Sequence, residues 1–588
     1  MSGIDWIVLV GSMIGIVLYG VYMGRGSTSM KSYFSSDKSI KWWTIGLSIM
    51  ATQASAITFL SAPGQAFTDG MRFVQFYFGL PLAMIIISTV FIPIYKKLNI
   101  LTAYEYLGQR FDNKTRLLGA VLFLTQRGLA AGFTIYAPAL VLSSILGWNI
   151  YYTNLVIGLL VIIYTVFGGT KAVAHTHKLQ MVIILSGMAL AGVLVVLKLP
   201  EFVGFGDALD IAGKMGKLNV IDWDFDPSSK YNVWSGILGG LFLALSYFGT
   251  DQSQVQRYIG DQPTKQSRIG LLFNGFVKIP MQFLILLIGA LVFVFYQFNA
   301  QPIYFNQTAI ELAKENAQSA SGESSLIYEL SDKERELDDK SVTYLNELTN
   351  EFDRVNETKK SALTNYLNFN EMGEEEAAHE NLKYALKYQN QADSIKKTAV
   401  AYINEKAPGS EESDVNYVFL NFVLDEFPIG LIGLLLACIL FASMSSTSGE
   451  LNALASTTIV DIYKQNINKN KSDEHYLKMS KIFTAFWGIY AILFAFFAGE
   501  LGSLIEAVNI LGSLFYGTIL GIFLVGFFMK KINGTTVFLA AALSEIVICL
   551  IYFNEWMAYL WLPLVGSVLV VISSLILSLF INKKQSTE

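Results

Sequence analysis

Hydroxyl side chains crowd one stretch of the chain, "FASMSSTSGELNALASTTIVDIYK", which begins at Phe441. It directly follows "PIGLIGLLLACIL", an apolar run typical of a helix that crosses a membrane. The hydroxyls belong to Ser443, Ser445, Ser446, Thr447 and Ser448. Hydroxyl groups inside a bilayer need partners, which can be a neighbouring helix, water or an ion.

Helical spacing places one set of small residues on a single face of this segment. Positions i, i+3, i+4 and i+7 are Ala442, Ser445, Ser446 and Gly449. One interpretation is close packing against another helix, with the serines bonded to their own backbone. The other is a site for sodium, a hard cation that binds several neutral or anionic oxygens. The two are compatible, because coordination also needs close approach of the helices.

Two other apolar segments are interrupted by polar residues, which indicates broken helices. The first, "WWTIGLSIMATQASAITFLSAPGQAFTDG", is interrupted at "MATQASA". The second, "WSGILGGLFLALSYFGTDQSQVQRYIG", is interrupted near its end. An unwound helix exposes carbonyls that can bind sodium, and broken helices at corresponding places in two halves of a chain indicate a secondary transporter's midplane site.

We expect a solute to bind between these two broken helices and the spans packed on them. The candidate residues are Gln53, Ser55, Thr58, Gln75, Tyr247, Phe248 and Gln252. The two aromatic rings either close over a solute as a gate or simply pack in the core.

Arg127 stands inside the long apolar segment "LFLTQRGLAAGFTIYAPALVLSSILG". An ionisable residue at such depth is costly and is functional by default. A guanidinium can bind a carboxylate through two parallel hydrogen bonds, so Arg127 predicts an anionic solute. The alternatives are that its side chain reaches the cytoplasmic surface or pairs with an acid such as Asp251, which would leave a neutral solute.

The composition places the whole chain in the membrane class. Of its 588 residues, 53% are hydrophobic and only 15% are charged. Apolar runs predict about thirteen spans, and the basic short loops then all fall on one side, which is cytoplasmic. The chain is therefore expected in the cell membrane (plasma or inner membrane), with its N-terminus outside and its C-terminus in the cytoplasm.

Five parts are expected along the chain. Residues 1–40 hold the first span and a cytoplasmic loop, 41–299 the core spans 1–7, 300–415 an insertion, 416–530 core spans 8–10, and 531–588 two further spans with a short tail. The first repeat covers about 41–199 and the second begins near 233. Between Glu311 and Asp414 lie 23 acidic and 12 basic residues, so the insertion is acidic. We expect it to be helical and extracytoplasmic, either as a solvated spacer or as a module for a periplasmic partner.

Three motifs are similar to those of the solute:sodium symporter family, which includes sodium/glucose, proline and sialic-acid symporters. They are "TDQSQVQRYIG", "YTVFGGTKAV" and "MSSTSGELNALASTTIVDIYK". The resemblance covers roughly residues 40–299 and 420–530. It implies an all-α integral membrane fold with a LeuT-type five-plus-five inverted-repeat core, and alternating access driven by Na⁺. Carried over by motif, the sodium site falls on the carbonyls of Ala51, Ala54 and Ala442 and the hydroxyls of Ser445 and Ser446.

The resemblance also bears on stoichiometry and solute. The family often has Thr-Asp where this chain has Thr176-His177, and Gly449 offers no side-chain oxygen, so we expect one sodium per solute. His177 itself is either a loop residue of no special role or part of a proton-linked gate. Sialic-acid symporters of the family carry an arginine in the span of Arg127 and use hydroxyls on the first broken helix, which Ser55 and Thr58 resemble.

The predicted function is sodium-coupled import of a small organic solute, anionic in the first hypothesis (sialic acid, another sugar acid or a monocarboxylate). A neutral sugar or polyol is the alternative. A membrane sensor or channel that uses the external helices is an alternative of a different class, for which the tail "NKKQSTE" offers no output domain. The expected partners are the small-molecule solute and the lipid bilayer, with no nucleic acid. We expect no enzymatic activity.

Overall fold

The computed structural model describes residues 2–24, 41–260, 262–323, 332–407, 413–501 and 503–585. The cytoplasmic loop expected up to residue 40 lies almost entirely outside the described residues. All the regular elements among the described residues are helices. In the first half they are α1 (Gly3–Gly24), α3 (Trp42–Gln53), α4 (Ala56–Asp69), α5 (Leu80–Ile86), α6 (Ile92–Leu98), α7 (Ala103–Arg110), α8 (Asn113–Leu146), α9 (Ile150–Leu197) and α10 (Phe205–Lys214).

The second half continues in the same style. Its helices are α11 (Gly240–Gly249), α12 (Gln252–Val255), α13 (Thr264–Phe298), α14 (Gln307–Glu323), α15 (Asp332–Met372), α16 (Glu375–Lys406), α17 (Val415–Glu426), α18 (Leu431–Thr457), α19 (Asp473–Ala495), α20 (Leu504–Phe528), α21 (Gly534–Phe553) and α22 (Leu562–Gln585). Short 3₁₀ or π segments lie between some of them, including η1 (Gly70–Tyr77) and η3 (Ser235–Gly239).

Both expected helix breaks are present. α3 ends at Gln53 and α4 begins at Ala56, so the interruption falls inside "MATQASA". The second break separates α11 from α12, where Asp251 is extended and its carboxylate accepts a hydrogen bond from the Ser253 amide. Side-chain capping of this kind competes with helix continuation, which explains the polar residues at the second interruption, whereas Ser55 at the first makes no such bond.

The described residues contain ten helices long and apolar enough to cross a membrane, and two shorter apolar helices, Gly3–Gly15 and Ser235–Gly249. One of the ten runs covers Ala56–Leu98, which is long enough for more than one span, and α9 holds two candidate spans, 150–167 and 179–197. The all-helical membrane fold is thereby confirmed, while the count of thirteen stays a prediction.

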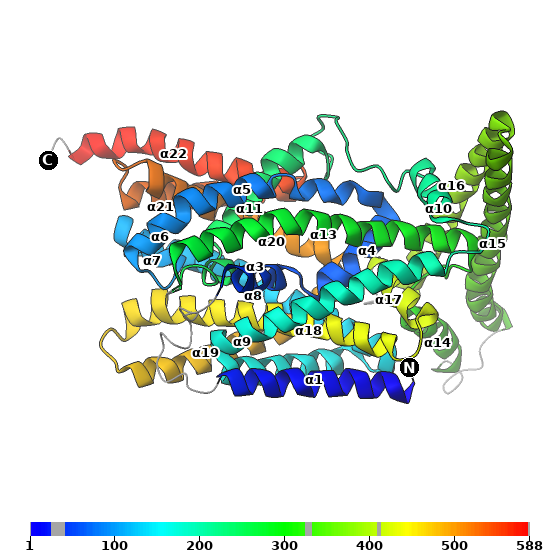
Figure 1. Cartoon of the computed structure of the whole chain (residues 1–588), viewed down its shortest axis with the longest axis horizontal. Coiled ribbons are helices and arrows are strands. Elements are labelled where there is room, and N and C mark those ends of the chain that lie inside the picture. The colour runs from blue at the N-terminus through cyan, green and yellow to red at the C-terminus, as the bar shows by residue number, and fades with distance from the viewer. Residues whose placement is uncertain are drawn as a thin grey trace.

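Most of these helices run side by side along the long axis of the molecule (Figure 1). The N-terminus lies at the end that carries α14–α17, and the C-terminus lies at the opposite end. This arrangement agrees with an odd number of crossings. Which end faces the cytoplasm remains a prediction.

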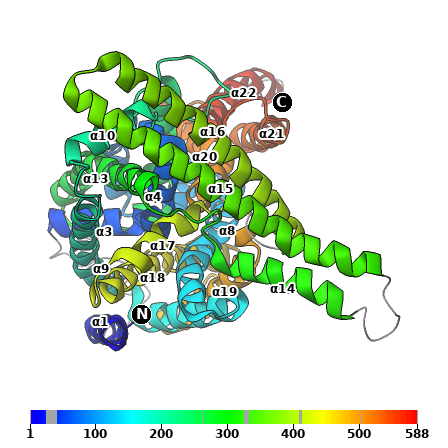
Figure 2. The same cartoon turned by 90° about the vertical axis from the view of Figure 1, so that its right-hand side faces the viewer.

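The insertion forms an antiparallel hairpin of α15 and α16 that lies across the end of the bundle (Figures 1 and 2). Its own apolar core includes Leu345, Phe352 and Ile395. The hydroxyl of Tyr366 donates to Asp210, and Lys396 lies 2.8 Å from the Asp414 carboxylate. These contacts join the hairpin to α10 and to the start of α17.

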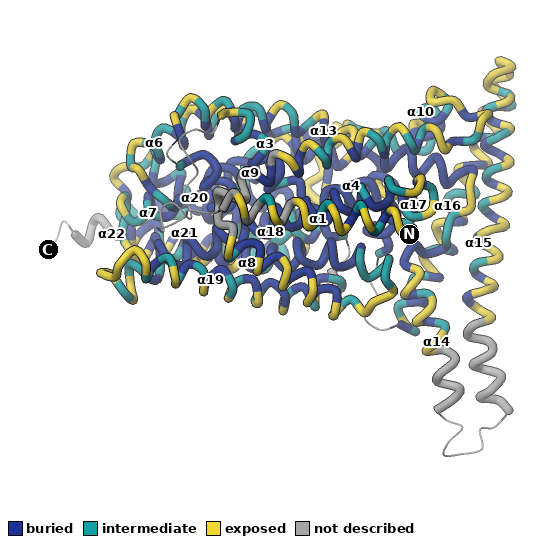
Figure 3. The backbone as a smooth tube through the Cα atoms, turned by 60° about the horizontal axis from the view of Figure 1, so that its bottom comes forward, coloured by how far each residue is buried: buried dark blue, intermediate teal, exposed yellow. Residues whose placement is uncertain are grey.

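α18 occupies the middle of the bundle. It packs against α1, α3, α8, α9 and α19, and nearly all of its residues from Ile432 to Thr457 are buried. Buried segments gather along the centre of the tube in Figure 3, whereas the hairpin is largely exposed. A central helix buried on all sides explains why its small residues are needed, since each neighbour must approach closely.

Candidate functional site

The expected sodium ligands lie where α3 ends and α18 passes. Ala51 is in the last turn of α3, Ala54 is in the break itself, and both are buried. Ala442, Ser445 and Ser446 are buried on α18. The carbonyl end of α3 carries the negative pole of its helix dipole, which favours a cation. The donor set of carbonyls and hydroxyls therefore suits sodium, and the described residues hold no cluster of three His, Cys, Asp or Glu that would suit a transition metal.

The two serine hydroxyls have protein partners as well. That of Ser445 donates to the Gln180 side chain of α9. That of Ser446 lies 3.1 Å from each of the Ala442 and Ser443 carbonyls on its own helix. This is the self-bonding expected for close packing, so both interpretations of the small face find support in the geometry.

His177 lies beside the same ligands. It is fully buried in α9 and is not a residue of an exposed loop, which was one of our two interpretations. Its Nε2 lies 3.1 Å from the carbonyl of Ser445, and its Nδ1 lies 3.1 Å from the Ser48 hydroxyl of α3. Because a carbonyl can only accept, the neutral ring carries its proton on Nε2 and accepts from Ser48. His177 thus joins the broken helix to α18.

A cavity of about 100 Å³ opens next to the first break. Six of the eight predicted solute-binding residues line it, namely Gln53, Ser55, Thr58, Arg127, Tyr247 and Phe248. Ser55 and Thr58 lie at the start of α4, where free backbone amides and the positive end of the helix dipole favour an anionic group. The cavity therefore lies between the two breaks, next to the expected sodium ligands.

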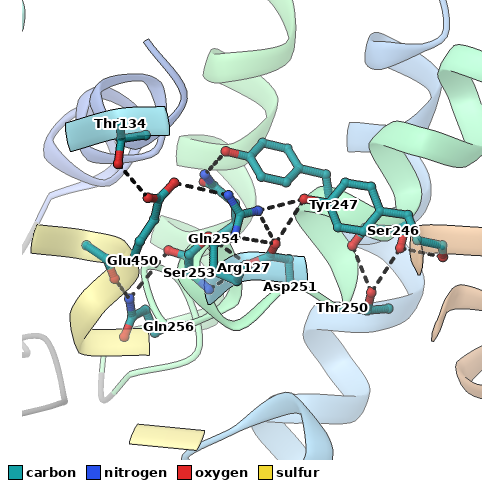
Figure 4. Close-up of polar contacts among 12 residues, drawn as sticks. Arg127, Thr134, Ser246, Tyr247, Thr250, Asp251, Ser253, Gln254, Gln256 and Glu450 are labelled. Carbon is teal, nitrogen blue, oxygen red and sulfur yellow. Dashed lines mark hydrogen bonds and ion pairs between the residues drawn. The ribbon is translucent and has the colours of Figure 1, made fainter. Parts of the chain in front are cut away.

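Arg127 is held by a dense polar network inside this cavity (Figure 4). Its Nε and Nη2 atoms donate to Asp251, and its Nη1 lies 3.1 Å from the Glu450 carboxylate. Nη2 also lies 2.6 Å from the hydroxyl of Tyr516, which donates to Asp251 over 3.0 Å. Arg127 is thus paired internally, as in the alternative that left a neutral solute, and it does not reach the surface because it is 3% exposed.

Gln75 and Gln252 do not line the cavity. Gln75 is in η1, where its side-chain amide bonds the Tyr231 carbonyl and accepts from the Asp222 amide. Gln252 bonds the backbone of Leu101 and Ala103. Gln75 thereby fastens the segment of Asp222 and Tyr231 to η1, and Gln252 fastens the residues before α7 to α12. Their polarity had suggested solute binding because sequence alone does not say toward which neighbour a side chain near a break points.

Other cavity residues escaped the sequence analysis. They include Thr52, Phe76, Tyr77, Thr134, Glu450, Asn509 and Tyr516. Glu450 carried a usable signal, because it is an acid within an apolar span and follows directly on the small face of α18. Two further basic residues are buried in the core, which the sequence analysis does not single out: Arg257 is 3% exposed and Lys278 is fully buried.

An all-helical membrane protein with two broken helices around a small central cavity has the architecture of the LeuT-type transporters. The chain belongs to the sodium:solute symporter family, whose model matches residues 33–321 and 394–543. The range between them, 322–393, holds all of α15 and the first part of α16. The predicted family is thereby confirmed.

Several relatives are similar over part of the chain. The human "Sodium/iodide cotransporter" is 34% identical over 263 residues, which cover 44% of this chain and 40% of that protein. The "Sodium-coupled monocarboxylate transporter 1" of Xenopus laevis is 33% identical over 266 residues, 45% of this chain and 42% of that protein. The aligned part thus spans less than half the length of these curated relatives.

Likeness in structure extends over nearly the whole chain. A solved structure of a Na⁺-coupled sialic acid symporter, in a substrate-bound outward-open state, matches with a TM-score of 0.71. It covers 98% of this chain and 97% of the other at 22% identity. At that identity the match establishes the fold alone, and the fold is the one that the family resemblance had implied.

Proposed function

We propose that this protein is a sodium-coupled symporter that imports a small organic anion. The observation that carries the proposal is the break between α3 and α4. It exposes the carbonyl end of α3, which packs against α18, the helix of Ser445 and Ser446, and it places the amide end of α4 beside the cavity. A cation and an anion can thus bind on the two sides of one break, each stabilised by the nearer helix dipole.

Coupling follows from this arrangement. Sodium between α3 and α18 would hold the two helices together and fix the break, and a fixed break places Ser55 and Thr58 for the solute. A ligand that binds one arrangement of the helices better shifts the population toward it, so sodium and solute each raise the affinity for the other.

The size of the cavity favours a small solute. Sites for drug-sized ligands have volumes of roughly 300–1,000 Å³, whereas this cavity has about 100 Å³. Among the anions considered, a short monocarboxylate fits this volume better than a sialic acid. The relatives named for monocarboxylate transport also favour a monocarboxylate over a sialic acid.

A neutral sugar or polyol is the second candidate, because one observation favours it. The Arg127 guanidinium is committed to Asp251, Glu450 and Tyr516, so it is not free to bind a solute carboxylate in this conformation. On this alternative Arg127 only supports the wall of the cavity.

Uptake into proteoliposomes tests both candidates. An inward sodium gradient should drive accumulation of radiolabelled acetate or lactate, and an equal potassium gradient should not. Competition by unlabelled carboxylates but not by neutral sugars would support the anion. Sodium-driven uptake of a sugar that no carboxylate inhibits would instead establish the neutral solute, and absence of any sodium-driven flux would refute the symporter.

The protein lies in a membrane, and we infer its orientation from the charges of its loops. Basic short loops place the C-terminal end in the cytoplasm, so the N-terminus and the α15–α16 hairpin lie outside. Modification of single cysteines introduced into the hairpin, by a reagent that does not cross membranes, tests this. If the cysteines are labelled only after the cells are opened, the hairpin lies in the cytoplasm and the orientation is the reverse of the one inferred. The two open roles of the hairpin, spacer or docking module, are both consistent with an external position.

A further inference from the structure

Arg257 is a buried cation with no acceptor among the described residues. It follows α12, at the second break, and is 3% exposed. None of its three side-chain nitrogens has a hydrogen-bond partner in the described part of the chain. A guanidinium keeps its charge in proteins, so its burial requires acceptor oxygens or an anion.

Neither Asp251 nor Glu450 hydrogen-bonds Arg257, because both acids are paired with other residues. Both oxygens of Glu450 are occupied, one by Arg127 and the other by Thr134. The two oxygens of Asp251 accept from Ser253 on one side and from Arg127 and Tyr516 on the other. The buried positive charge of Arg257 is therefore left over after these pairs are formed.

The position of the guanidinium is fixed by a glycine. A Cβ atom added to Gly449 would lie 2.3 Å from Nη2 of Arg257, so the guanidinium is packed directly against the backbone of α18. Any side chain at position 449 would displace it. Gln256, the neighbour of Arg257, donates to the Gly449 carbonyl over 3.0 Å and holds the two segments together.

Arg257 packs on Gly449, which stands along α18 between Ser446, an expected sodium ligand, and Glu450, which lines the cavity. It interacts electrostatically with Tyr247, which lines the cavity, and with His177, which contacts Ser445. We propose that Arg257 and the glycine surface behind it form a binding site for one small anion. The anion is either the carboxylate of the solute or an inorganic anion, such as chloride, that accompanies it.

The two sources differ in what they require. That the anion is the solute's own carboxylate rests on the proposed function. The existence of the anion site does not, because it follows from the unpaired guanidinium alone. A test by binding, independent of transport, therefore separates failure of the site from failure of the proposed function.

The probes are chloride and acetate. Each probe is added as its sodium salt in place of the sodium salt of HEPES, a bulky sulfonate, so that the sodium concentration stays constant. The purified full-length protein is monitored by its thermal unfolding temperature, because a ligand that binds the folded state raises it. We expect a saturable rise with at least one probe. Arg257→Gln should weaken the apparent affinity for the anion by about tenfold or more. The rise in unfolding temperature caused by sodium at a constant anion concentration should stay unchanged.

Three further variants make the result specific. Arg257→Lys keeps the charge but loses the planar fork, so a weakened response should remain. Gly449→Ala keeps the arginine in the sequence but displaces its guanidinium, and should also weaken anion binding. Arg72→Gln removes an exposed arginine, 46% accessible, and should change nothing.

The outcomes decide the proposal and the source of the anion. A response to acetate that chloride does not compete with assigns the site to the solute's carboxylate, and a response to chloride assigns it to an accompanying ion. No saturable response of the wild-type protein to either probe would overturn the proposal. The proposal would also be overturned if Arg257→Lys and Gly449→Ala both left the response to the anion unchanged. These two variants decide the proposal even if Arg257→Gln fails to fold.

Discussion

At the scale of single residues, the hydroxyls of α18 separate sodium binding from helix packing. Ser445→Ala and Ser446→Ala should each raise the sodium concentration for half-maximal uptake by about tenfold, because each removes one oxygen from a charged ligand. Ser448→Ala is the matched control, since its hydroxyl bonds only the Ser445 carbonyl of its own helix. Sodium dependence is measured as uptake into proteoliposomes. If both variants behave like the control, the small face serves packing alone.

Arg127 allows a test of internal pairing against solute binding. Arg127→Ala leaves Asp251 and Glu450 buried without their cation and should lower the free energy of unfolding by about 3–5 kcal/mol. The double change Arg127→Ala with Asp251→Asn should recover part of this loss, as followed by thermal unfolding in detergent. Asp251→Asn alone is the control. A double variant no more stable than Arg127→Ala would show that the pair does not carry the stability.

What could be predicted at this scale depended on distance along the chain. The small face of α18 follows from local periodicity, and the break at "MATQASA" from local polarity. The pair of Arg127 and Asp251 joins residues 124 positions apart, and it stood only as an alternative to solute binding. The third partner, Glu450, was not considered, because sequence does not show which helix faces which.

At the scale of elements, burial of a lysine makes the hairpin sensitive to pH. Lys359 of α15 is 1% exposed and donates to Gln389 of α16. Burial lowers its pKa to about 8 from the usual 10.5, with Asp393 opposing and Lys217 adding to the shift. The unfolded hairpin therefore holds more protons between pH 8 and 10.5, so stability rises with pH across that window and is flat below it.

Lys359→Met should remove this rise and stabilise the hairpin at pH 7 by up to about 3 kcal/mol, the equivalent of the pKa shift. Loss of the bond to Gln389 will reduce that gain. The measurement is resistance of α15 and α16 to proteolysis at pH 7 and pH 9.5 in the full-length protein. Lys387→Met changes an exposed lysine and should have no effect. A wild-type hairpin equally resistant at both pH values would contradict the prediction.

Elements were predicted better than their side-chain contacts. Hydropathy found apolar helices long enough to cross a membrane, and the acidic, helix-periodic insertion did form helices. Two features could not be read from the sequence. The helix α9 continues without a break across "GGTKAVAHTHK", a basic segment that predicts a short cytoplasmic loop. His177 in this segment is therefore buried. The hairpin also packs on the bundle through single polar contacts, such as Tyr366 with Asp210, that have no sequence pattern.

At the scale of the whole molecule, the number of sodium ions per solute is a testable property of the site. His177 and Gly449 take positions where an acid or a hydroxyl would add oxygens, so we expect one sodium per solute. The reversal potential of solute flux across set sodium and solute gradients measures this ratio. A ratio near two would show that a second group of oxygens binds sodium elsewhere in the bundle.

The hairpin offers the last test, because its two ends meet on the membrane part. The amide of Phe305 lies 2.9 Å from the Asp414 carboxylate, and the Asn421 side chain donates to the Phe305 carbonyl. A short Gly/Ser bridge can therefore replace residues 307–412 without moving either end. The ligands of the sodium site and the lining of the cavity all lie outside the deleted range.

We expect sodium-driven uptake within about threefold of wild type, since no charged or hydrogen-bonded contact of the site is removed. Tyr366→Phe in the intact chain is the milder companion, since it frees the hairpin from Asp210 without removing it. The deletion variant must still unfold cooperatively and still respond to sodium. If such a variant loses uptake, the hairpin is part of the transport cycle. If it keeps uptake, the hairpin is a spacer or a docking module.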